Sequence, residues 1–315
     1  MTQEADLEHQ LEELIKNSAQ KAVGGVGKFA VALSGGIDSG LLAALTGTRH
    51  AVTVHLPYGE VYDEFSDAQN TAAELRIENH LIITPEHERF DEVMRKALLL
   101  IERTTEHFSL FPLYLMFERL AQEGFESLVF GDGPDESMCG YVRCIMMDHI
   151  YNAPKAVETF TPYESLFVKA LPWPWETYAK ALDRPLYQVR PLMVWEPLLR
   201  GICKVEMSLT RLDVGGICDI FGNHFGIRIL RPYMAAEVDE FMFNLPDDCK
   251  IRDHWGKYLL RRVAARYVPL KVVWRRRKMG GPVYPVNRLQ GWMEKGEFDK
   301  TRYRKYQKEI LSSFD

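Results

Sequence analysis

Short continuous apolar runs alternate along the first half of the chain with stretches in which apolar residues recur every three or four positions. Continuous runs are typical of strands buried on both faces of a parallel sheet, and the wider spacing is typical of amphipathic helices. Strands are predicted at residues 29–33, 51–56, 80–83 and 127–130. Helices are predicted at residues 7–22, 39–45, 65–75, 90–102 and 110–122. Strands separated by helices of this length predict right-handed crossovers and a doubly wound parallel sheet.

Beyond about residue 145 the pattern becomes helical and less regular. Amphipathic helices are predicted around residues 238–245 and 259–267. No repeat or linker divides the chain. We therefore expect one domain over residues 1–315, with an α/β core at about 1–145 followed by a largely helical part at about 146–315.

Composition narrows the classes of function. Apolar residues make up 46% of the chain, and 39 Lys and Arg against 44 Asp and Glu give a net charge of −5. This balance argues against non-specific binding to nucleic acid or to a membrane. The start of the chain is acidic, where a signal peptide would be basic and then apolar, so we expect a cytoplasmic protein. The five cysteines form no Cys-x-x-Cys pair, which favours buried thiols over a disulfide framework or a zinc site.

The first candidate site is the stretch at residues 34–40 (SGGIDSG), which joins a predicted buried strand to a predicted helix. Glycines allow backbone N–H groups to turn towards an anion, and the N-terminus of a helix adds partial positive charge. Ser34 and Ser39 add hydroxyl donors. Asp38 would repel a phosphate, and its presence makes sense if it holds a Mg²⁺ ion that bridges to the anion. A tight structural turn is the alternative interpretation.

A second loop, at residues 131–136 (GDGPDE), follows another predicted strand and carries three carboxylates. In open parallel sheets, ligands bind outside the carboxyl ends of the strands, so we expect the two loops to face one site. Asp38 and Asp135 would share the Mg²⁺ ion, while Asp132 or Glu136 does acid–base or orienting work. A solvated acidic turn is the alternative.

Basic residues near the C-terminal end form two further features. Two pairs, Lys257 with Arg261 and Arg262 with Arg266, are spaced four apart on a helix predicted to start near residue 254. Like charges at this spacing oppose helix formation unless an anion faces them, and a solvated basic face is the plain alternative. The run at residues 275–278 (RRRK) leads into a glycine loop, which suits a lid over a polyphosphate, a targeting patch or a plain surface run.

Taken in order, these motifs resemble the synthetase domain of the asparagine synthetase family, of the PP-loop ATP-pyrophosphatase type. The family's pyrophosphate loop, second acidic motif, lysine segment and C-terminal loop are similar to residues 34–39, 131–141, 228–261 and 277–282. The resemblance implies an adenine nucleotide alpha-hydrolase-like α/β fold, with ATP as substrate and Mg²⁺ as cofactor. It further implies a ligase that adenylates a small-molecule carboxylate, releases AMP and pyrophosphate, and transfers the acyl group to ammonia or an amine.

The same resemblance implies roles for single residues. Lys257 would stabilise both the pentavalent phosphorus and the oxyanion, and Asp132 stands where family members typically carry Glu. Asp38 and Asp135 would be the metal ligands. Binding of ATP and pyrophosphate is implied for Ser34, Gly35, Gly36, Asp38, Ser39, Val54, Gly131 and Lys278. We expect Lys257→Ala to abolish turnover and to leave the fold intact, because a lysine in a cleft contributes little to stability.

The source of the nitrogen stays open. Glutamine-dependent family members begin with a nucleophilic cysteine and a glutaminase domain, whereas Thr2 follows Met1 here. The nitrogen would then come from free ammonia, from a separate glutaminase subunit or from an amine on a substrate. Ammonia-dependent asparagine synthesis proper, adenylation of a nucleobase or tRNA, and a catalytically inactive nucleotide-binding paralogue are the alternative functions. The sequence is silent on whether the chain forms a homo-oligomer.

Overall fold

The computed structural model describes residues 3–57, 64–105, 107, 109–141, 144, 203, 206–207, 210, 214–275, 293–294, 297–298 and 300–313. Within these ranges, a five-stranded parallel sheet has the strand order β3-β2-β1-β4-β5. Its strands are β1 (Phe29–Ala32), β2 (His50–Val54), β3 (Asn79–Ile83), β4 (Ser127–Val129) and β5 (Arg228–Leu230). The direction in which strands are added reverses between β1 and β4. The predicted doubly wound parallel sheet is therefore confirmed, and its switch point lies between these two strands.

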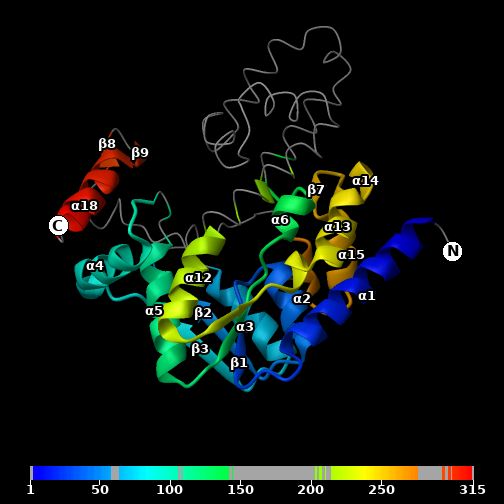
Figure 1. The fold of residues 1–315 in the computed structure, drawn as a ribbon. Helices are drawn as coiled ribbons and strands as arrows, with labels where there is room; N and C mark the ends of the chain where they lie inside the picture. The colour runs from blue at the N-terminus through cyan, green and yellow to red at the C-terminus, as the bar shows by residue number, and fades with distance from the viewer. Residues whose placement is uncertain are drawn as a thin grey trace, which may run out of the picture.

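Helices cover both faces of the sheet (Figure 1). One face packs against α1 (Gln3–Val23), α2 (Ile37–Thr46), α3 (Phe65–Glu74), α13 (Ala236–Asn244) and α15 (Tyr258–Ala264). The other packs against α4 (Phe90–Ile101), α5 (Leu110–Gln122) and α12 (Val214–Phe225), while α18 (Lys300–Ser312) lies outside this layer, against α4. Side chains of each strand alternate between the two cores, as pleating requires: Val31 and Val129 enter the first, Ala30 and Leu128 the second.

Shorter elements connect these layers. They are η1 (His87–Arg89), α6 (Pro134–Ser137), η2 (Pro232–Met234), α14 (Asp247–Lys250), β6 (Ile251–Arg252), β7 (Trp255–Gly256), α16 (Leu270–Val273), β8 (Met293–Glu294) and β9 (Glu297–Phe298). β6 pairs antiparallel with β7, and β8 with β9. Among the helices in the part of the chain that the structure describes, none combines the length and the apolar character needed to cross a membrane.

The predicted strands and helices of the first half are confirmed to within a few residues, but β5 was not predicted. It lies in the part expected to be helical, and it is only three residues long. So short a segment shows no two-residue period. Its extended form comes instead from pairing with β4, in which Leu128 lies opposite Ile229.

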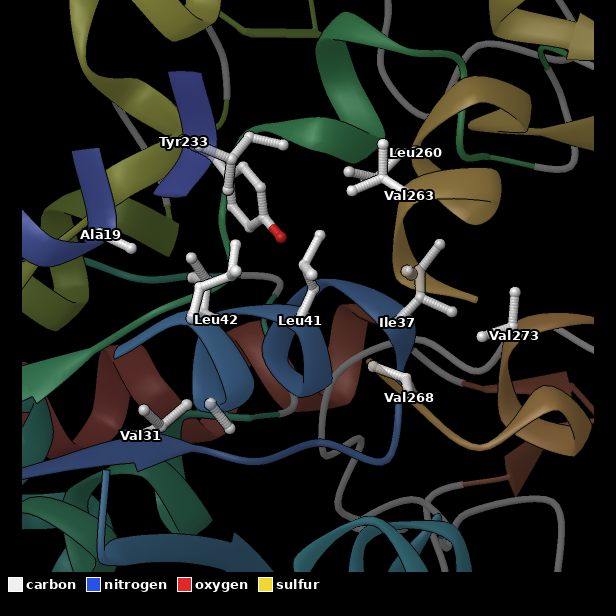
Figure 2. Packing of buried hydrophobic residues seen from close by; sticks show 14 of the residues in the cluster. Ala19, Val31, Ile37, Leu41, Leu42, Tyr233, Leu260, Val263, Val268 and Val273 are labelled. Atoms are coloured by element: carbon white, nitrogen blue, oxygen red, sulfur yellow. The ribbon is translucent and has the colours of Figure 1, made fainter. Parts of the chain in front are cut away.

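Tyr233 links the segment after β5 to the first turn of α2. Its side chain is fully buried, and Figure 2 shows its hydroxyl group directed towards α2 among apolar side chains of that helix. The hydroxyl donates a hydrogen bond to the Asp38 carbonyl oxygen at 3.0 Å. The buried tyrosine thus fixes the start of α2 relative to the edge of the sheet.

The basic helix face finds its counter-charges on α1. Glu8, which is 7% exposed, pairs with both Arg262 and Arg266, and Arg262 Nε lies 2.8 Å from its carboxylate. Glu4 pairs with Arg262, and Glu12 with Arg266. Arg262 and Arg266 are therefore partly exposed but neutralised, because an acidic row spaced by four on α1 meets a basic pair with the same spacing on and just after α15.

Candidate active site

Hydrogen bonds shape the loop between β1 and α2. The hydroxyl oxygens of Ser34 and Ser39 lie 3.1 Å apart, and the Ser34 N–H also donates to Ser39 Oγ at 3.1 Å. Ser39 Oγ in turn donates to the Gly36 carbonyl at 3.3 Å. Gly36 directly precedes α2, and no side chain among the described residues caps this end of the helix. A helix N-terminus without a side-chain cap is a suitable place for an anion.

Gly35 allows this loop to pass close to the start of α3. Its φ of +76° is left-handed, and a Cβ atom on it would come within 2.6 Å of the Glu64 carbonyl oxygen. The carboxylates of Glu64 and Asp67 both bind the guanidinium group of Arg275, which follows α16. The loop between β1 and α2 at residues 34–40, which we call the phosphate-type loop, therefore meets the start of α3 and the residue that follows α16.

The loops after β1 and β4 are in contact. A Cβ atom on Gly131 would lie 3.1 Å from the Ser39 nitrogen and 3.2 Å from Asp38 Cβ. β1 and β4 are neighbours in the sheet at the switch point. The two loops thus face each other at the place where open α/β sheets bind ligands.

The side chain of Lys257 lies between the carboxylates of the two loops. Its Nζ atom is 2.6 Å from Asp38 Oδ2 and 2.7 Å from Asp135 Oδ1. Lys257 is only 4% exposed. Burial acts to lower the pKa of Lys257, but the negative charges of Asp135 and Asp38 outweigh it, so the pKa lies above its usual value. The group is a permanent cation at neutral pH.

A short hairpin brings Lys257 to this position. The residue follows β7 directly and precedes the first residue of α15, so the helix begins after the lysine and not near residue 254. Its φ of +56° is left-handed, which costs a non-glycine residue about 1 kcal/mol. Its N–H donates to the Met138 carbonyl at 3.0 Å. The hairpin and the segment that follows the acidic loop (residues 131–136) together hold this strained conformation.

Asp132 takes part in a separate ion pair. Arg231 Nε lies 3.2 Å from Asp132 Oδ2, and Arg231 Nη1 lies 2.7 Å from Asp219 Oδ1. Burial raises the pKa of the Asp132 carboxyl, although the charge of Arg231 opposes the rise. The arginine fixes the orientation of this carboxyl group, and the raised pKa brings it nearer the range of an acid–base group.

Glu136 anchors the acidic loop to the protein interior. It is 4% exposed, and its carboxylate accepts hydrogen bonds from the hydroxyls of Tyr141 and Thr210, the second at 2.8 Å. Burial, reinforced by the charge of Asp135, raises the pKa of Glu136 to about 7. These contacts suit Glu136 to holding the loop in place.

The remaining predicted residues lie at the same edge of the sheet or outside the described residues. Val54 is the last residue of β2, whose carboxyl end neighbours that of β1. The next side chain, His55, packs its ring 4.3 Å from that of Phe65, measured between centroids. Lys278 and the loop at residues 277–282 lie outside the described residues, so the lid stays a prediction.

Arg231 and Tyr233 contact the site but were given no role from sequence. Both follow β5, so their side chains reach the carboxyl edge of the sheet, where the loops after β1 and β4 also lie. Recognition of β5 would have pointed to them, because residues just beyond the carboxyl end of a parallel strand share that edge. The short strand hid this signal.

Two carboxylates are present for a metal ion. Over the described ranges, no three His, Cys, Asp or Glu side chains are grouped so that they could hold a metal. Asp38 and Asp135 supply hard oxygen donors, and Mg²⁺ is usually bound by one or two carboxylates together with water and phosphate oxygens. The donor set therefore fits Mg²⁺ that is held mainly by a nucleotide.

Comparison with known proteins identifies the family. The asparagine synthase family matches residues 10–313. The chain belongs to this family. Membership of the asparagine synthase family indicates a domain of the ATP-dependent ligase type.

A curated protein and a solved structure are among the proteins that the chain resembles. Over 134 residues the chain is 28% identical to "Putative asparagine synthetase (glutamine-hydrolyzing) 1" of Methanocaldococcus jannaschii, a stretch that covers 42% of this chain and 25% of the relative. The match thus spans a quarter of that relative's length. A solved NH3-dependent NAD synthetase from Campylobacter jejuni is similar at 17% identity and a TM-score of 0.32, over 67% of this chain and 96% of the other.

Proposed function

We propose that the chain is an ATP-dependent carbon–nitrogen ligase that adenylates a small-molecule carboxylate and passes the acyl group to ammonia or an amine. The observation that carries the proposal is the contact of Lys257 with both Asp38 and Asp135. A buried cation between two loops at the switch point of a parallel sheet suits a bound polyphosphate. Membership of the asparagine synthase family supports this class of reaction.

The loop after β1 would bind the pyrophosphate part of ATP. The N–H groups of Gly35 and Gly36 and the hydroxyl groups of Ser34 and Ser39 would donate to phosphate oxygens, and the N-terminus of α2 would add positive potential. In this arrangement the end of β2 around Val54 lines the adenine side of the site, because it lies beside β1 at the carboxyl edge.

Asp38 and Asp135 would hold Mg²⁺ together with phosphate oxygens. Bound there, the ion would neutralise charge that develops on the leaving pyrophosphate. The two carboxylates would then give up part of their contact with Lys257. The ammonium group is thereby released towards the phosphates, where it acts as a point charge.

Lys257 would act in both half-reactions. First, a substrate carboxylate oxygen bonds to the α-phosphorus, the bond to the bridging oxygen breaks, and pyrophosphate leaves. Second, the amine nitrogen attacks the acyl carbon, loses a proton, and AMP leaves. The lysine would stabilise the negative charge on the phosphorus oxygens in the first step and on the oxyanion in the second. Asp132, held by Arg231, would accept the proton of the amine.

Product analysis tests this proposal. The chain is incubated with Mg²⁺, ATP, ammonium and a panel of amino acids and small carboxylates, aspartate included, and AMP with pyrophosphate is separated from ADP with phosphate. Acid-dependent AMP and pyrophosphate are expected, and they should disappear in a Lys257→Met variant prepared in parallel. Formation of ADP would contradict adenylation. If the chain bound ATP but cleaved it with none of the carboxylates, the inactive nucleotide-binding paralogue would be favoured.

A further inference from the structure

Three of the five cysteines lie together next to the acidic loop. The sulfur atoms of Cys139 and Cys203 are 3.5 Å apart, and Cys139 also forms a side-chain hydrogen bond with Cys144. All three residues are at most 1% exposed. The sulfur atoms of a disulfide are about 2 Å apart, so an approach of about 1.5 Å would bring Cys139 and Cys203 to bonding distance.

Cys139 adjoins the backbone that positions Lys257. Met138, the residue before it, accepts the Lys257 N–H. The Cys139 carbonyl oxygen packs against Gly256 so closely that a Cβ atom there would lie 2.3 Å from it. Cys139 itself has a left-handed φ of +57°. Because packed interiors transmit strain, a displacement of Cys139 would reach the contacts that place Lys257.

We infer that Cys139 and Cys203 form a reversible disulfide when the protein meets a peroxide, and that this bond weakens the nucleotide site. The two sulfurs belong to different segments. Cys139 lies three residues after the acidic loop, and Cys203, from a later segment, also donates a hydrogen bond to the Ser137 carbonyl at 3.5 Å. The inference goes beyond the proposed ligase reaction, since disulfide formation requires no substrate of that reaction.

Cys203 is the sulfur that reacts first. A hydrogen bond from Cys139 lowers the pKa of Cys203 against the effect of burial, and the nearby ammonium group of Lys250 lowers it further. Hydrogen bonds to Cys144 and Cys203 raise the pKa of Cys139. The lowered pKa favours Cys203 as the attacking sulfur, and Cys139, with its sulfur 3.5 Å away, is placed to resolve the product. Because both thiols are buried, peroxide reaches them when the packing around the pair opens locally.

The reaction consumes one molecule of hydrogen peroxide. The Cys203 thiolate attacks one peroxide oxygen, the O–O bond breaks, and hydroxide leaves with a proton as water, which produces a sulfenic acid. Cys139 then attacks the Cys203 sulfur, the S–O bond breaks, and the oxygen leaves as a second water with the Cys139 proton. In total, two thiols lose two electrons and two protons, and the peroxide is reduced to two waters.

Peptide mapping under non-reducing conditions tests the bond directly. The reduced full chain is treated with hydrogen peroxide, and peptides are analysed by mass spectrometry before and after dithiothreitol. We expect a cross-linked peptide pair that contains Cys139 and Cys203 and that dithiothreitol separates. Cys203→Ser, which preserves the size of the side chain, should abolish this pair. Cys218→Ser is the matched control, because Cys218 is equally buried but lies on α12, where burial raises the pKa of its thiol.

Nucleotide binding tests the consequence for the site. Oxidised wild type should bind ATP with Mg²⁺ on the order of tenfold more weakly than reduced wild type, because a displaced Lys257 would lose part of its contact with the phosphates, and tenfold in affinity corresponds to about 1.4 kcal/mol. Dithiothreitol should restore binding. Cys203→Ser should bind ATP as reduced wild type does and should be insensitive to peroxide, whereas Cys218→Ser should remain sensitive.

Three results would overturn the inference. A peroxide product that links Cys139 to Cys144, or that leaves Cys203 as a sulfinic acid beside an unmodified Cys139, would reject the assigned pair. An intact Cys139–Cys203 disulfide with unchanged ATP affinity would reject the effect on the site. The effect on ATP affinity rests on the proposed nucleotide site, whereas the peptide mapping needs neither ATP nor turnover, so failure of the ligase proposal would leave the mapping unaffected.

Discussion

The ammonium group of Lys257 lies 2.6 Å from the carboxylate of Asp38, although 219 positions separate the two residues along the chain. Asp135, from the loop after β4, completes the contact at 2.7 Å. Three segments that are distant in sequence thus place opposite charges within one largely buried site. Loss of any one charge changes the electrostatic balance of the other two.

Replacement of Lys257 should affect both activity and stability. Lys257→Met leaves two partly buried carboxylates close together without their cation, so we expect the free energy of unfolding to fall by about 2 kcal/mol or more. If the proposed reaction is correct, turnover should fall by roughly 100-fold or more. Chemical denaturation and product analysis measure the two effects. The premise that Lys257 lies exposed in a cleft is wrong, because its side chain is buried, and a loss of stability therefore replaces the expectation of an unaffected fold.

A double variant separates these effects. Lys257→Met combined with Asp38→Asn removes the cation together with one of the two negative charges, so stability should recover relative to Lys257→Met alone while activity stays low. If the double variant were less stable than the sum of the single changes, the ion pair between these residues would not be the source of the stability loss.

Gly35 and Gly47 form a matched pair for testing the phosphate-type loop. Both have left-handed φ values, +76° and +62°, but a Cβ atom on Gly35 would meet the Glu64 carbonyl at 2.6 Å, whereas a Cβ atom on Gly47 has nothing within 4 Å. Gly47→Ala should cost about 1 kcal/mol, the strain of the conformation alone. Gly35→Ala should cost more and should also weaken ATP binding. If the two variants had the same melting temperature and the same ATP affinity, the close contact at Gly35 would be contradicted.

The pairing of α1 with α15 predicts a stability effect without a catalytic one. Glu8→Ala removes the shared partner of Arg262 and Arg266, which keep Glu4 and Glu12 and are partly exposed, so the free energy of unfolding should fall by about 1 kcal/mol. Glu13→Ala on the same helix removes an exposed pair with Lys16 and should change it by less than about 0.5 kcal/mol. Both variants should bind ATP like wild type, as titration of the folded proteins would show.

His80 predicts a dependence of stability on pH. Burial lowers the pKa of His80 below its usual value, so in mild acid the unfolded chain binds a proton that the folded chain does not. This contribution is present above the usual histidine pKa and is lost as pH falls below it. His80→Gln should therefore lose less stability than wild type between about pH 7.5 and pH 5. Urea denaturation at both pH values measures the difference, and parallel pH profiles would reject the assignment.

The neighbours of His80 fix the tautomer of its ring. The Thr53 hydroxyl donates to the Leu33 carbonyl at 2.7 Å, so its oxygen accepts from His80 Nε2, also at 2.7 Å. This chain of hydrogen bonds needs one proton on the imidazole, at Nε2, and no positive charge. It also supports the end of β1, directly before the serine that opens the phosphate-type loop.

The sequence pattern alone was sufficient to predict those strands in which consecutive residues are apolar because both faces are buried. β1 and β2 are predicted by continuous apolar runs, because strands covered by helices on both faces need apolar side chains at every position. The two loops could be located for the same reason, since each follows such a strand. β5 escaped prediction because its extended form depends on β4 and not on its own three residues.

Contacts between distant segments could not be derived from spacing alone. The basic pairs around Arg262 suggested an anion, and the partner proved to be Glu8 on the first helix. A matching acidic row spaced by four was visible in the sequence, but nothing local says which rows meet. The proximity of Cys139 to Cys203 likewise depends on packing, so a count of cysteines could not reveal it.

The position of β5 beside β4 has a consequence for synthesis on the ribosome. When the segment through Val129 has emerged, β4 can pair with β1 but has no neighbour on its other side until residues 228–230 follow. Through that interval the nascent chain carries an open strand edge, which is a template for wrong pairing. The sheet is then completed, Tyr233 is buried and Lys257 follows within a short further stretch of translation, so the candidate site and the last strand of the core mature together.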